Sequence, residues 1–177
     1  MEHSMNGLIF LVLSASIASA PVRAEDPACT AVYEATARML ATPHHQYQSS
    51  THGEAGGQTQ MSEIVSTATS RYLKVGGQWS VSGSSPEKEV QEMQERRKTL
   101  HPSCRLVRDE TIEGTPARLY SIHNQSEFAT SDQRLWVATA SGLPVREEID
   151  LNGGEGMVRR LVTRYVYTNV QKPAGLP

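Results

Sequence analysis

The apolar residues near the start of the chain recur at the three- and four-residue intervals of a helix. The positions are Val32, Ala35, Met39 and Leu40. Asp26 precedes this segment as a candidate N-cap, and Pro27 occupies the first helical turn, where its missing N–H costs no hydrogen bond. Pro43 stops the pattern, because proline cannot continue a helix. The spacing therefore predicts a helix over residues 27–41.

A second helical segment begins at Ser85 and Pro86, which repeat the order of a cap followed by proline. It runs to about Leu100, and its apolar residues Val90, Met93 and Leu100 form only a narrow stripe. A helix with so narrow a stripe lies on the surface, with one edge against the body of the protein.

The other segments alternate between apolar and polar residues, as strands do. The predicted strands are residues 44–51, 61–67, 71–75, 78–81, 105–112, 117–123, 133–140, 145–151 and 157–170. Short turns such as Gly76-Gly77 and Ser141-Gly142 separate neighbours, which favours sequential antiparallel pairing. We predict an α+β fold with one curved antiparallel sheet of about eight or nine strands and two helices on one side.

Apolar residues occur on both faces of this predicted sheet. Leu161, Tyr165 and Tyr167 share one face of the last strand, whereas Leu135 and Trp136 point to opposite faces. Neither face is therefore simply solvated. One interpretation is an ordinary core whose far face is covered by loops or a partner. The other is a cavity between sheet and helices that accepts an apolar guest.

If a groove exists, its candidate ligand-binding residues are Trp136, Leu135, Tyr165 and Tyr167. Trp136 and Leu135 cannot both line it, because neighbours on a strand point to opposite faces. Trp136 is the better candidate, since its large ring gives much contact area at little conformational cost.

Residues 7–20 are all apolar or small, and they are too few to span a bilayer as a helix. They predict a signal peptide over residues 1–24, cleaved after Ala24 or, less favourably, after Ala20 before Pro21. The n-region contains Glu2 and no Lys or Arg, which leaves a buried or membrane-associated helix as the alternative. We expect one domain over residues 25–177, periplasmic or secreted, with no permanent membrane anchor.

Cys29 and Cys104 are the two cysteines of the chain. In an oxidising compartment such a pair in a small domain is most simply a disulfide. Neither residue lies in a C-x-x-C motif, and no nucleophile motif surrounds either one. We therefore predict a structural Cys29–Cys104 bridge.

Charge and motifs limit the other kinds of function. The chain has 17 Lys+Arg and 19 Asp+Glu, which disfavours nucleic acid as the partner, because phosphate neutralisation needs a basic excess. His44 and His45 would point to opposite faces of a strand, so with His52 they are interpreted as surface histidines rather than a metal site. Carboxylates at 109–110 and 147–150 are interpreted as salt-bridged or solvated. We expect no catalytic residues, no metal and no cofactor.

The sequence GTPARLYSIH followed by RLWVATASGLPVREEIDL is similar to a strand pair and hairpin of the LolA/LolB-like periplasmic lipoprotein carriers. The hairpin residues are Trp136, Gly142, Leu143, Pro144 and Arg146. The local match covers residues 105–170, and the order of elements agrees over 27–170. The resemblance implies an open half-barrel whose concave face binds acyl chains or another hydrophobic ligand beneath helical lids. The polar second helix and an aromatic content of 6% depart from that pattern.

Three functions remain. The first is an exported, non-catalytic carrier or binding protein for a hydrophobic ligand such as a lipid. The second is an exported interaction module or envelope-complex subunit that docks a protein. The third is an enzyme on a helix-plus-sheet scaffold of the nuclear-transport-factor-2-like kind. A dry apolar groove favours the first, a flat apolar patch the second, and a pocket with convergent His and carboxylates the third.

Overall fold

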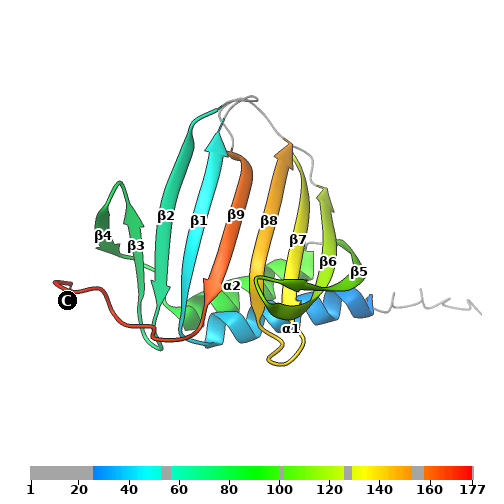
Figure 1. Cartoon of the computed structure of the whole chain (residues 1–177), viewed down its shortest axis with the longest axis horizontal. Coiled ribbons are helices and arrows are strands. Elements are labelled where there is room, and N and C mark those ends of the chain that lie inside the picture. Colours follow the sequence, from blue (N-terminus) through cyan, green and yellow to red (C-terminus); the bar gives the residue numbers. More distant parts are fainter. Residues whose placement is uncertain (1–25, 53–56, 100–101, 126–128, 153–157, 177) are drawn as a thin grey trace, which may run out of the picture.

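The computed structural model describes residues 26–52, 57–99, 102–125, 129–152 and 158–176, and within them two helices lie against a nine-stranded sheet (Figure 1). The helices are α1 (Pro27–Ala41) and α2 (Pro86–Thr99). The strands are β1 (His44–His52), β2 (Thr59–Ser66), β3 (Arg71–Val75), β4 (Gln78–Val81), β5 (Ser103–Ile112), β6 (Thr115–Gln125), β7 (Thr130–Ala138), β8 (Pro144–Asn152) and β9 (Val158–Val166). The predicted signal peptide, residues 1–24, lies outside the described residues.

The sheet consists of two meanders joined edge to edge. Strands β1 to β4 pair in sequence, strands β5 to β9 pair in sequence, and β1 pairs with β9 to connect the two sets. All the pairings are antiparallel, as the short turns predicted. β4 and β5 form the two edges, and α2 connects them by crossing from one edge to the other.

Local capping fixes both helices where the sequence predicted them. The Asp26 side chain accepts a hydrogen bond from the amide of Ala28 at 2.8 Å, with Pro27 following in the first turn. Ser85 accepts one from the amide of Lys88 at 3.2 Å at the start of α2. Neither α1 nor α2, the helices of the described ranges, is long and apolar enough to cross a membrane.

The core lies between α1 and strands β5 to β7. Val32 and Ala35 of α1 pack against a buried group from the sheet. Its members are Cys104, Tyr120, Ile122, Leu135 and Val137. Cys29 and Cys104 form the predicted disulfide, with their Cα atoms 5.0 Å apart. The bridge fixes the first turn of α1 to the start of β5.

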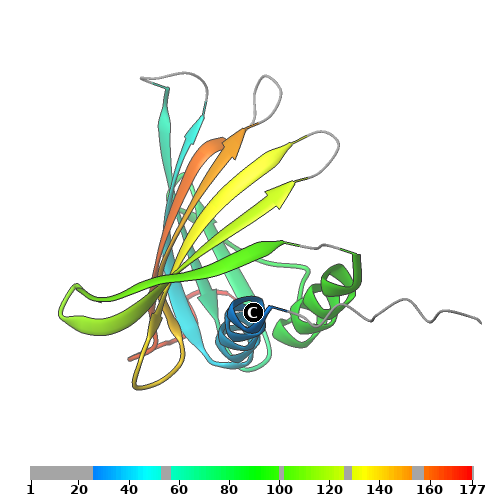
Figure 2. The ribbon, with the colours of Figure 1, turned by 90° about the vertical axis from the view of Figure 1, so that its right-hand side faces the viewer.

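Both helices lie on the concave side of the curved sheet, over one end of the strands (Figure 2). Register shifts after Thr51, Leu106 and Trp136 contribute to the curvature, because a bulge bends its strand and increases the local twist. The predicted α+β class, with one curved open sheet and two helices on one side, is confirmed.

Candidate functional site

A row of polar residues crosses the middle of the sheet on its concave face. Gln48 of β1 pairs with Thr163 of β9, Thr163 pairs with Glu147 of β8, and Glu147 pairs with Leu135 of β7. Directly paired residues point to the same face, and Leu135 belongs to the core beneath α1. Gln48, Thr163 and Glu147 therefore face the helix side of the sheet.

Glu147 is the charged member of this row, and two strands supply its hydrogen bonds. Its Oε2 accepts a hydrogen bond of 2.8 Å from the Tyr165 hydroxyl of β9, and its Oε1 accepts one from the Gln133 amide of β7. Burial raises the pKa of Glu147, while these two donors act in the opposite direction. Burial and the neighbouring carboxylate also raise the pKa of Tyr165, so its hydroxyl remains a donor.

Thr163 contributes a buried hydroxyl to the row. Its side chain is fully buried, and its Oγ1 has no hydrogen-bond partner within the described residues. Leaving a buried hydroxyl unpaired costs about 1–3 kcal/mol. A ligand group or a water molecule that reaches Thr163 would remove this cost.

Apolar side chains continue the same face away from the helices. Ile149 of β8 pairs with Leu161 of β9, and Leu151 lies two residues further along β8. All three are half-buried. We call the following residues the open concave face: Gln48, Gln133, Glu147, Ile149, Leu151 and Leu161. Neither α1 nor α2 covers this end of the strands (Figure 2).

A second polar network lies under the C-terminal end of α1. His44 is fully buried, and its Nδ1 lies 2.7 Å from the Thr42 carbonyl oxygen, to which it donates. Its Nε2 lies 2.7 Å from the Gln46 side-chain nitrogen and accepts from it, which makes the ring neutral. Burial lowers the pKa of His44 accordingly. The interpretation of His44 as a surface histidine was therefore wrong, because Tyr165 and Tyr167 enclose its ring.

The two neighbouring candidates Leu135 and Trp136 lie on opposite faces, as alternation predicted. Leu135 is 2% exposed beneath α1. Trp136 packs instead with Ala117 and Leu119 on the face away from the helices. Trp136 does not line the concave face, which corrects our preference for it, because one residue of register on a strand reverses the face.

The other two candidates, Tyr165 and Tyr167, come together beside His44. Their ring centroids lie 6.3 Å and 6.1 Å from the His44 ring. Tyr165 faces the open concave face through Glu147, whereas the Tyr167 hydroxyl donates to the Pro144 carbonyl at 2.6 Å. Only Tyr165 is thus joined to the polar row, and ligand binding by either residue stays a prediction.

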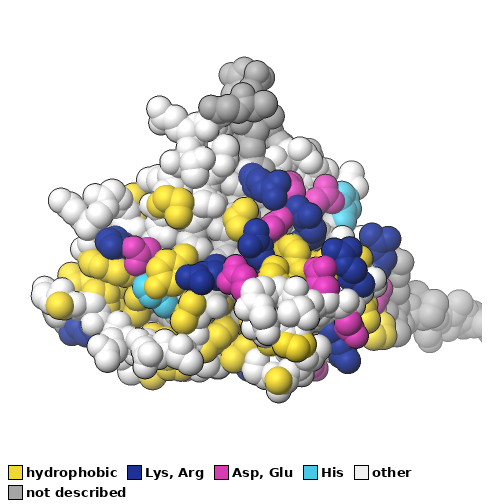
Figure 3. Space-filling view, in the orientation of Figure 1, with side chains coloured by type: hydrophobic (Ala, Val, Ile, Leu, Met, Phe, Trp, Pro, Cys, Tyr) yellow, Lys and Arg dark blue, Asp and Glu magenta, His cyan; other side chains and the backbone are white. Residues whose placement is uncertain are grey.

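The convex face is built from paired charges and aromatic rings. Trp136 donates its indole N–H to Glu110, and the Arg146 guanidinium lies 5.8 Å from its ring. Glu148, also on this face, is buried and pairs with three arginines, Arg134, Arg146 and Arg160. Basic and acidic side chains alternate over the surface of this face (Figure 3). The charges largely compensate one another, which is typical of a stabilising network.

Glu147 and Glu148 illustrate how the predicted carboxylate groups divide between the faces. Glu148 is salt-bridged as predicted, whereas Glu147 is half-buried and forms no salt bridge with the residues that the structure describes. Among the described residues no group of three or more His, Cys, Asp or Glu is arranged to hold a metal ion. His45 lies on the convex side with Glu63 at 3.1 Å, opposite to His44.

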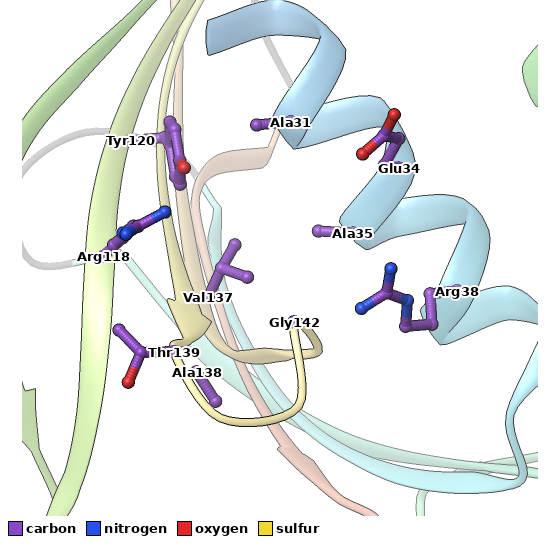
Figure 4. Close-up of a pocket in the computed structure, with 10 residues that line it drawn as sticks. All are labelled: Ala31, Glu34, Ala35, Arg38, Arg118, Tyr120, Val137, Ala138, Thr139 and Gly142. Atoms are coloured by element: carbon purple, nitrogen blue, oxygen red, sulfur yellow. The ribbon is translucent and has the colours of Figure 1, made fainter.

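A small pocket lies between α1 and the β6–β7 strands, beside the β7–β8 turn (Figure 4). Its volume is about 150 Å³. It is lined by Ala31, Glu34, Ala35, Arg38, Arg118, Tyr120, Val137, Ala138, Thr139 and Gly142. We call it the arginine pocket after Arg38 and Arg118. With two guanidinium groups in its wall it is not a dry apolar groove.

Comparison with known proteins shows similarity in structure only. No protein-family model matches the sequence, and no curated protein matches it. Among solved structures, MucB is 14% identical with a TM-score of 0.46, over 83% of this chain and 63% of MucB. The MucA/MucB complex of Pseudomonas aeruginosa gives 14% identity and a TM-score of 0.44, over 83% of this chain and 62% of the matched one.

A LolA superfamily protein from Nitrosomonas europaea is also similar, at 9% identity and a TM-score of 0.31, over 78% of this chain and 91% of that protein. A member of the LolA superfamily, the family that the sequence resembles, is therefore among the similar solved structures. The chain spans less than two thirds of the MucB chains that it matches. TM-scores below 0.5 carry no function over from these proteins to this chain.

The polar row was not predicted from the sequence, because the candidate ligand-binding residues were chosen among apolar and aromatic side chains. Gln133 shares a face with Leu135, Glu147 with Ile149, and Thr163 with Tyr165. The sequence signal that could have revealed the row is a polar residue at a strand position that faces the core, where an apolar residue is normally found. That signal gives the face of each residue but not the contact between them.

Proposed function

We propose that this protein is an exported, non-catalytic binding protein whose open concave face holds an amphipathic ligand such as a lipid or fatty acid. The observation that carries the proposal is the position of half-buried Ile149, Leu151 and Leu161 directly beside the polar row, on a part of the sheet that neither helix covers. The apolar part of the ligand would cover these three side chains. Its polar group would lie toward the polar row.

The physical basis of binding is burial of apolar surface, which contributes about 25 cal/mol per Å². Glu147 supports binding rather than chemistry, because Tyr165 and Gln133 already engage both of its oxygens. The proposed ligand therefore is bound and released unchanged. A periplasmic or secreted location, and the lack of a permanent membrane anchor, belong to the same proposal.

Dodecanoate below its micellar concentration is a suitable probe, with binding followed by calorimetry. Leu161→Gln places an amide on the open concave face and should weaken binding about tenfold or more. Val162→Gln is the matched control, because Val162 is half-buried on the opposite face of the same strand. Equal weakening by both variants, or no binding to the unchanged protein, would contradict the proposal.

Native mass spectrometry of protein purified from its own envelope tests the ligand class directly. We expect a co-purified lipid whose mass adds to that of the protein and whose occupancy falls in Leu161→Gln. Trp136 emission, recorded in a Trp79→Phe background, should not respond to dodecanoate, since Trp136 lies on the far face. A large response there would place the ligand on the convex side.

Exposed apolar residues at the sheet edges favour the second candidate function, an envelope protein partner. Leu106 and Val107 on β5 are 49% and 39% exposed, and Val81 on β4 is 48% exposed. Edge strands with such residues are sites where another chain can pair. An envelope partner that co-purifies with the unchanged protein, and is lost in Leu106→Lys but retained in Leu161→Gln, would favour this function over lipid binding.

A further inference from the structure

The arginine pocket brings together two cations from elements that are distant in the sequence. Arg38 lies in the last turn of α1, and Arg118 lies on β6. Both guanidinium groups are on the pocket side of their elements (Figure 4). Tyr120, a buried residue that is 6% exposed, also lines the pocket (Figure 4). Three hydrogen-bond donors thus surround one small space.

Within the described residues, Asp109 is the only carboxylate that pairs with any of these donors. Arg38 donates to the Ser141 carbonyl at 2.9 Å, and it forms no ion pair with a carboxylate in these ranges. Arg118 has a loose pair with exposed Asp109 at 3.6 Å. The Tyr120 hydroxyl has no hydrogen-bond partner in the described part of the chain. Glu34 of α1 also lines the pocket (Figure 4).

We propose that the arginine pocket binds a carboxylate or phosphate group between Arg38 and Arg118, with the Tyr120 hydroxyl as a third donor. Guanidinium groups recognise both anions through paired N–H donors, and such charge-assisted hydrogen bonds are stronger than neutral ones. The cavity, of about 150 Å³, has room for a carboxylate or phosphate group.

This inference does not rest on the proposed function, because the pocket and the open concave face share no residue. The anion is either a small free molecule or the charged end of a longer one. Inorganic phosphate and acetate probe the first source. Dihexanoyl phosphatidic acid, which carries the same phosphate chemistry on a short lipid, probes the second.

Nuclear magnetic resonance on the ¹⁵N-labelled, oxidised chain provides the test at constant ionic strength. We expect saturable shifts of the arginine side-chain Nε–Hε signals and of the Gly142 amide as phosphate is added. Arg118→Gln should raise the Kd about tenfold, and Tyr120→Phe about fivefold. Arg96→Gln on α2 is the control, because it removes an equal charge from an exposed position outside the pocket.

Arg38→Gln also removes the contact to Ser141, so Arg38→Lys accompanies it as a variant that keeps the charge but loses the planar fork. The expected Kd of Arg38→Lys lies between those of the unchanged protein and Arg118→Gln. Tighter binding of the phosphatidic acid than of phosphate would identify the longer molecule as the source, and equal binding the free anion. Non-saturable shifts, or the same Kd in Arg118→Gln and Arg96→Gln, would overturn the proposal.

Discussion

Two neighbouring residues of β8, Glu147 and Glu148, have different chemical environments because they lie on opposite faces of the sheet. Glu147 is one residue away from Glu148, yet it lies among hydrogen-bond donors of the concave side, whereas Glu148 lies among arginines of the convex side. Their environments differ because strand neighbours point to opposite faces. Burial raises the pKa of Glu147.

The raised pKa of Glu147 makes the stability of the fold depend on pH. The folded state holds this proton more tightly than the unfolded state, whose carboxyl titrates near 4.5. The stabilising contribution is therefore complete below that value and is lost as the pH rises through the folded pKa. We expect Glu147→Gln to remove this component, so that the variant gains stability relative to the unchanged protein as the pH rises.

Urea unfolding from about pH 4 to about pH 8 measures this difference. Glu34→Gln is the matched control, because Glu34 is exposed on α1. The change of the stability difference with pH should be larger for Glu147→Gln than for Glu34→Gln. A pH-independent difference for Glu147→Gln would contradict the assignment.

Leu135 should be one of the residues most costly to truncate. It is 2% exposed between the sheet and α1, so Leu135→Ala removes apolar contacts and leaves a cavity. The expected loss in the free energy of unfolding is about 2–5 kcal/mol. Leu106→Ala, which makes the same chemical change at a 49% exposed site, should cost far less. Similar losses for the two variants in urea unfolding would be inconsistent with the described core.

At the scale of elements, α1 is held on the sheet at both of its ends. The Cys29–Cys104 bridge fixes its first turn to β5, and Arg38 in its last turn donates to Ser141 of the β7–β8 turn. Gly142 in that turn has φ +66°, a conformation that favours glycine, and the Arg38 side chain passes directly over its Cα. The walls of the arginine pocket are formed by α1, strands β6 and β7, and the β7–β8 turn.

Removing the disulfide should destabilise the protein without changing the strand order. The double variant Cys29→Ser with Cys104→Ser is expected to lose about 2–5 kcal/mol of unfolding free energy, since the bridge restricts the unfolded chain. Urea unfolding measures the loss, with Ser103→Ala as a control beside the bridge. Thiol titration of the unreduced, denatured protein should find no free thiol, and two free thiols would refute the bridge.

At the scale of the whole molecule, the sheet presents two different surfaces from one set of strands. The concave side combines a core under the helices with the open concave face, and the convex side carries compensating charges (Figure 3). On the convex side, Glu148 and its arginine partners compensate one another's charge. The concave side is therefore where we place both proposed binding sites.

At the scale of the whole chain, the proposed function requires that the protein is exported. When the full chain is expressed in a bacterium, the intact mass of the periplasmic form should correspond to a chain that begins at Glu25 and contains the disulfide. Leu8→Arg, which places a charge in the apolar stretch, should abolish this processing. A periplasmic mass that still includes residues 1–24, or a product that begins at Pro21, would disprove the predicted cleavage.

The sequence by itself determined the features that depend on short-range patterns. Both helices begin at the predicted prolines, and the β3–β4 hairpin turns at Gly76 and Gly77 with φ of +58° and +82°. The disulfide was also determined, because the chain offers a single pairing of its two cysteines. In each case the physical cause lies within a few residues or in the count of residues.

Tertiary structure alone decided how distant segments meet. The pairing of β1 with β9 joins the two meanders, and no turn in the sequence specifies it. That pairing placed Gln48 beside Thr163, and the face that α1 covers decided that Leu135 rather than Trp136 points inward. Alternation along a strand fixes which residues share a face. Which face becomes the concave one depends on where the helices pack, and therefore on the whole chain.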